Sequence, residues 1–130
     1  MSSALGYVLV FLGGGVGAAA RHAANRAALA LVGPNYPAGT LFVNIAGSIA
    51  MGLLAGWFAF RGETSTAAER LFLTTGVLGG FTTFSAFALD ATLMWERHDV
   101  AAAAVYIASS VLLSMAGLIG GMFLVRISVS

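Results

Sequence analysis

The chain has 130 residues, of which 59% are hydrophobic and 8% are charged, and its formal net charge is +1. A typical soluble domain carries roughly 25% charged residues, and the scattered arginines form no basic cluster that would follow a phosphate backbone. The composition therefore excludes an ordinary soluble domain and a nucleic-acid-binding protein. The absence of cysteine also removes disulfides and thiolate chemistry.

Apolar runs divide the chain into four predicted membrane-spanning helices. Such a helix uses about 20 mostly apolar residues, and the charged residues lie between these runs or near their ends. We expect helices over residues 4–31, 39–60, 69–95 and 99–126, with a turn rich in Gly and Pro at 33–37 between the first two. The sequence thus predicts an all-α membrane protein in which residues 1–130 form a single four-helix transmembrane domain.

The first predicted helix has an apolar N-terminal half and two arginines, Arg21 and Arg26, in its second half, and Arg21 lies closer to the middle of the helix. No basic residue precedes the apolar segment, which favours a retained helix over a cleaved signal peptide. Arg21 has two interpretations. It either extends to the lipid headgroups or points into a vestibule, where it would raise the local anion concentration.

The second predicted helix carries an asparagine, Asn44, about one turn from its start and on the same face as Gly47 and Ser48. A polar side chain inside a span must find a hydrogen-bond partner or line a cavity. The Asn44 amide therefore either ties two helices together or donates to an anion.

The third predicted helix contains the run GGFTTFSAF at residues 79–87, in the middle of its charge-free stretch. Adjacent Gly residues and β-branched Thr residues disfavour an uninterrupted helix, so we expect a break at Gly79–Gly80. The freed carbonyls would have to be buried in protein or bound to a cation. The alternative is an intact helix with a Gly-rich packing surface. Phe84 and Phe87 share one face, either as core or as rings whose positive edges meet an anion.

The fourth predicted helix places Tyr106, Ser110 and Ser114 at i, i+4 and i+8, which aligns three hydroxyls on one face. They form either a ladder of hydrogen-bond donors or a set of unrelated residues. In the second case the serines bond back to their own helix and the tyrosine marks the membrane interface.

Two wider features concern chemistry and orientation. The carboxylates form no obvious pair inside a span, and the Gly-rich segment at 13–17 has no preceding strand of the kind a dinucleotide fold needs, so we expect no catalytic residues and no enzyme.

The arginines are divided almost evenly between the two sides of the predicted bundle, so the positive-inside rule does not predict a single orientation in the membrane. A weak bias to one orientation and insertion in both orientations as antiparallel pairs both fit this balance.

Three segments together resemble the Fluc, or CrcB, family of fluoride channels: residues 13–21 (GGGVGAAAR), 39–48 (GTLFVNIAGS) and 79–87. The length, the four spans and the spacing of Tyr106, Ser110 and Ser114 agree as well, so the likeness covers essentially the whole chain. The resemblance implies a passive fluoride channel in the cell membrane that exports cytoplasmic fluoride. It also implies an antiparallel, dual-topology homodimer with two pores at the subunit interface.

The resemblance further implies roles for individual residues. The backbone carbonyls of Gly79 and Thr82 would bind a structural sodium ion, and Arg21 would lie in a vestibule. Two residues depart from the family pattern: Ala86 replaces a common Thr, and Asp90 stands where Glu is usual. The implied fluoride pore consists of Asn44, Thr83, Phe84, Ser85, Phe87, Tyr106, Ser110 and Ser114.

A donor-rich, charge-poor path suits fluoride, which is a small, strongly hydrated hydrogen-bond acceptor that a full ionic site would hold rather than release. A small exporter or a structural membrane subunit is the alternative. Exporters of cations generally need a membrane-buried carboxylate, and the candidate here, Asp90, lies near a helix end. This feature argues against the exporter.

Overall fold

The computed structural model describes the backbone of residues 1–130 and every side chain except that of Glu63, and over this extent it contains helices and turns but no strand. Four helical spans are long and apolar enough to cross a membrane. They are α1 (Ser3–Val32), α2 (Ala38–Arg61), a composite third span (Ala67–Glu96) and α6 (Val100–Val129). The predicted four-helix, all-α fold is confirmed, and the predicted bounds differ from these by at most three residues.

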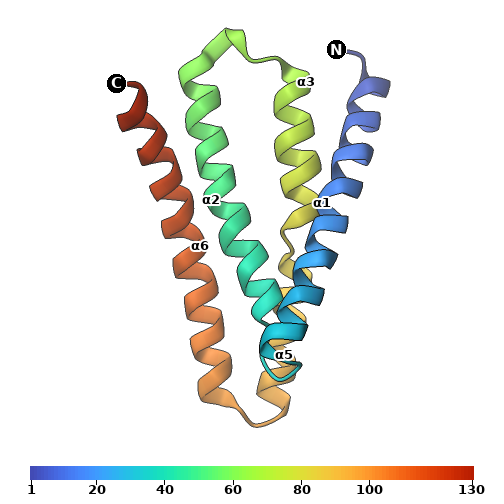
Figure 1. Cartoon of the computed structure of the whole chain (residues 1–130), viewed down its shortest axis with the longest axis vertical. Helices are drawn as coiled ribbons and strands as arrows, with labels where there is room; N and C mark the ends of the chain where they lie inside the picture. The colour runs from blue at the N-terminus through green and yellow to red at the C-terminus, as the bar shows by residue number, and fades with distance from the viewer.

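The spans run alternately up and down, so both termini lie at the same end of the bundle (Figure 1). Gly33 ends α1 with φ of 96°, a conformation that glycine adopts without steric cost. The short helix η1 (Gly62–Thr64) follows α2, and Thr66 then caps α3 (Ala67–Arg70) in a reciprocal pair of hydrogen bonds with Glu69.

The third span is broken, as predicted, but not at the glycine pair. After α3 it continues as a π-helix, η2 (Leu71–Leu78), then as one turn, α4 (Gly79–Phe81), and resumes as α5 (Phe84–Glu96). The extended residues are Thr82 (φ −85°, ψ 157°) and Thr83 (φ −153°, ψ 117°), whereas Gly79 has helical angles. The physical reason is that β-branched Thr favours extended backbone.

The glycine pair contributes to packing instead. A Cβ atom on Gly80 would collide with the Gly14 carbonyl, and one on Gly17 would collide with the Val77 carbonyl. Backbone therefore lies against backbone where α1 crosses η2 and α4, as expected for small residues at helix contacts in lipid.

A second close contact joins α2 to α6. A Cβ atom on Gly52 would collide with the Leu118 carbonyl, and one on Gly121 would lie 2.7 Å from the Ile49 carbonyl oxygen. The bundle is thus built from two tightly packed helix pairs, α1 with the first half of the third span and α2 with α6. Buried side chains are few and gather where α5 meets α6, around Met94 and Tyr106.

Candidate functional site

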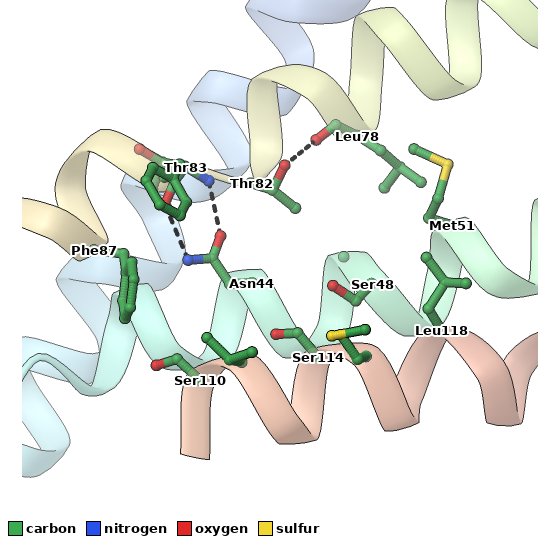
Figure 2. Close-up of a pocket in the computed structure, with 14 residues that line it drawn as sticks. Asn44, Ser48, Met51, Leu78, Thr82, Thr83, Phe87, Ser110, Ser114 and Leu118 are labelled. Atoms are coloured by element: carbon green, nitrogen blue, oxygen red, sulfur yellow. Dashed lines mark hydrogen bonds between the residues drawn. The ribbon is translucent and has the colours of Figure 1, made fainter. Parts of the chain in front are cut away.

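A cavity of about 330 Å³ lies between α2, α6 and the broken part of the third span, and it is open on one side. Its wall brings together polar residues from all three elements (Figure 2). The polar lining residues are Asn44, Ser48, Thr82, Thr83, Ser110 and Ser114. No charged side chain is among the lining residues that the structure describes.

Asn44 on α2 forms hydrogen bonds with the backbone at the break. Its amide nitrogen donates to the Thr83 carbonyl at 3.0 Å, and its carbonyl oxygen accepts from the Thr83 amide at 2.8 Å (Figure 2). The side chain thus supplies hydrogen bonds that the third span loses where it is extended. The tie between helices is therefore present. The amide nitrogen carries two hydrogens, and the described contacts use one of them.

Arg21 on α1 donates a hydrogen bond to the backbone just before the break. Its Nε donates to the Gly80 carbonyl at 3.1 Å, and the side chain is half-buried. Arg21 therefore binds the carbonyl end of the first half-span, where a cation also complements the helix dipole, and it does not extend to the headgroups. It is not among the cavity-lining residues. On the other side of the break, the Thr83 hydroxyl caps α5 by accepting from the Ala86 amide at 3.2 Å.

Ser110 and Ser114 present hydroxyls to the cavity without a hydrogen-bond partner among the described side chains and backbone. Ser110 is 5% exposed. The adjacent Ser109 behaves differently, because its hydroxyl donates to the Val105 carbonyl at 2.7 Å. Bonding back to the helix thus occurs at Ser109 and does not occur at the two cavity serines. A buried hydroxyl without a partner costs free energy, so these two are suited to a ligand that accepts hydrogen bonds.

Tyr106 is fully buried and does not line the cavity. Its hydroxyl donates to Asp90 Oδ2 at 3.1 Å, and its ring packs 5.4 Å from the Phe87 ring centroid. The Tyr106 hydroxyl, which the sequence pattern suggested as a donor to an anion, therefore donates to the Asp90 carboxylate instead. Asp90 also lines a second, smaller hollow of about 140 Å³ together with Asn35 and Arg97.

Phe84 and Phe87 lie side by side in the cavity wall, with ring centroids 5.5 Å apart and planes tilted by 57°. Phe84 is 79% exposed, so it is not a core residue of the single chain. Ser85 is also exposed, is not among the lining residues, and lies with its hydroxyl 3.4 Å from that of Thr83.

The cavity therefore gathers six of the eight predicted pore residues and leaves out Ser85 and Tyr106. It also includes residues that sequence reasoning did not select: Ser48, Met51, Leu78 and Leu118. Ser48 follows Asn44 by one helical turn, and the sequence already placed it on the same face as Asn44 without naming it as a pore residue. The three apolar residues carry no such signal because they look like any lipid-facing residue.

The chain is similar in sequence to known proteins along most of its length. Residues 8–122 match the family described as CrcB-like protein, Camphor Resistance (CrcB). A protein of Rhodopseudomonas palustris named fluoride-specific ion channel FluC is 53% identical over 120 residues, which are 92% of this chain and 96% of that protein. A FluC protein of Methylobacterium nodulans is 54% identical over 122 residues, covering 94% and 97% of the two chains. FluC 2 of Nitrobacter hamburgensis is 50% identical over 122 residues, covering 94% and 98%.

Proposed function

Because the chain belongs to the CrcB family, we propose that it is a fluoride-selective channel that lets cytoplasmic fluoride leave the cell passively. The family is one of ion channels and not of enzymes, and the four apolar spans fit a multi-pass protein of the cell membrane. The alternative of a cation exporter has less support, because the carboxylate of Asp90 is already bound by Tyr106.

The observation that carries the proposal is the pair of unpartnered hydroxyls, Ser110 and Ser114, in a cavity without charged walls. Fluoride is a compact acceptor that keeps its water strongly, so a path through protein must replace that water with donors. Two serine hydroxyls and the remaining N–H of Asn44 supply such donors, and the ring edges of Phe84 and Phe87 add weaker positive charge. Without a full positive charge, the ion is stabilised and still released.

The open side of the cavity supports assembly as a dimer. Phe84 lines the cavity and is largely exposed in the single chain, and a water-filled or ion-filled path open to lipid tails would leave polar groups unsatisfied. A second copy in the opposite orientation would cover it, and the two-fold symmetry would create two pores. The even distribution of arginines at the two ends of the bundle supports insertion in both orientations.

The break also supports a structural sodium ion between the two copies. Thr82 and Thr83 are extended, so the helical hydrogen bonds are interrupted there, and Arg21 takes the Gly80 carbonyl. The carbonyls of Gly79 and Thr82 are the oxygen ligands we propose for sodium, because unwound backbone in a span is a known type of site for this ion. The ion would stabilise the junction and would not need to permeate.

The test is anion efflux from liposomes that contain the purified protein, with protein-free liposomes as the control. We expect rapid fluoride efflux and chloride efflux at the level of the control. Chloride efflux as rapid as fluoride efflux would refute the proposal.

A further inference from the structure

The cavity changes from polar to apolar along its length. On α2, Ser48 is followed one turn later by Met51, and on α6, Ser114 is followed by Leu118. On the third span, which runs the opposite way, Leu78 precedes Thr82 by one turn. Met51, Leu78 and Leu118 therefore lie together at one end of the cavity, opposite Asn44, Phe87 and Ser110 (Figure 2). We call these three residues the apolar collar.

The collar lies toward the end of the bundle that holds both termini. Both α2 and α6 run toward that end, as Figure 1 shows. The polar part of the cavity lies on the other side of the collar. An ion that moves from the polar part toward the termini therefore meets the collar.

The two collar residues on α2 and α6, Met51 and Leu118, are positioned by close backbone packing between these helices. The side chain of Leu78 is 8% exposed, and Met51 and Leu118 are half-buried. At this level α2 and α6 touch directly, because Gly52 leaves no room for a Cβ atom beside the Leu118 carbonyl. The Thr82 methyl group lies against Gly47 on the polar side of the collar. At the level of the collar, α2 and α6 thus have little freedom to move apart.

The collar side chains cannot replace the water molecules that a passing ion loses. In the polar part of the cavity, hydroxyl and amide donors replace hydration, whereas aliphatic and thioether side chains donate no hydrogen bond. Losing hydration without a replacement is costly for any small ion, and apolar constrictions of this kind limit conduction by excluding water.

We propose that Met51, Leu78 and Leu118 form an apolar constriction that sets the rate of fluoride flux, while the polar cavity sets the selectivity. This inference rests on the proposed function, because it takes the cavity as the path of the ion. It separates two properties of the channel and assigns them to different residues.

The test replaces collar residues by a small polar side chain, Met51→Ser and Leu118→Ser, each with an apolar control, Met51→Leu and Leu118→Ile. Fluoride and chloride efflux from liposomes are measured per folded protein, with folding scored by gel filtration and thermal unfolding in detergent. We expect each Ser variant to raise fluoride efflux by about tenfold, which corresponds to ~1.4 kcal/mol of barrier, and we expect the apolar variant at the same position to show no such increase. Chloride efflux should stay at the level of protein-free liposomes.

Fluoride efflux that is unchanged or lower in the folded Ser variants would overturn the proposal. A parallel rise in chloride efflux would overturn it too, because it would indicate a leak through loosened packing. If one Ser variant does not fold, the other carries the same test. A parent protein that carries no fluoride would refute the proposed function itself, whereas a conducting parent with unresponsive Ser variants would refute the constriction alone.

Discussion

The adjacent residues Ser109 and Ser110 on α6 offer a matched pair of substitutions. Ser110→Ala removes a cavity hydroxyl that has no described partner, and Ser109→Ala removes a hydroxyl that bonds to the Val105 carbonyl. Each change removes one serine hydroxyl group, and the two residues are neighbours on one helix. Their effects on stability and on flux should therefore differ only through what each hydroxyl contacts.

The expected magnitudes follow from the contacts. A buried hydroxyl without a partner costs about 1–3 kcal/mol, so Ser110→Ala should leave stability unchanged or raise it by ~1 kcal/mol. A hydrogen bond to a charged group contributes about 1.5–3 kcal/mol, so loss of this donor to fluoride should lower the flux by about tenfold to a hundredfold. Ser109→Ala should leave the flux unchanged, because its hydroxyl is used within its own helix.

The assay combines fluoride efflux from liposomes with thermal unfolding of the same preparations in detergent. Equal flux in the two Ala variants would refute the assignment of Ser110 to the ion path. A clear loss of stability in Ser110→Ala alone would show that its hydroxyl has a partner within the folded protein.

Three further predictions concern the break, the rings and the helix contacts. Asn44→Ala removes both hydrogen bonds to Thr83 and should lower stability in thermal unfolding by about 2–4 kcal/mol, and an unchanged melting temperature would contradict this role. Phe84→Leu should leave folding intact, since apolar shape is largely kept, and should reduce fluoride efflux, whereas normal efflux would make the ring a packing residue. Gly52→Ala places a methyl group against the Leu118 carbonyl and should destabilise the protein by about 1–3 kcal/mol. The control Gly120→Ala, with nothing within 4 Å of the new Cβ atom, should be neutral or slightly stabilising in the same unfolding assay.

The four spans could be predicted from the sequence because each depends on a local property, a long apolar run between charged or turn-forming residues. The predicted ranges and the observed bounds of α1, α2, the third span and α6 therefore agree closely. The break was also predicted from a local signal, the run of Gly and Thr residues. It was expected at Gly79–Gly80, whereas the extended residues are Thr82 and Thr83. The sequence does not show that Gly80 is needed for contact with Gly14 on α1.

The site was harder to predict because its properties depend on partners far away in the chain. The i, i+4, i+8 spacing placed Tyr106 with Ser110 and Ser114, but Asp90 on another helix takes the tyrosine hydroxyl. Arg21 likewise finds its partner, Gly80, on the third span. The collar residues Met51 and Leu118 have no distinguishing chemistry, so only their position in the folded chain identifies them.

The central claim is that the chain forms a passive path that selects fluoride over chloride. The most direct measurement is the reversal potential of the current through the purified protein in a planar bilayer, with a fluoride salt on one side and the corresponding chloride salt on the other. The account predicts a large potential whose sign is that of a fluoride-conducting path. A reversal potential near zero, with current carried equally by both anions, would contradict it.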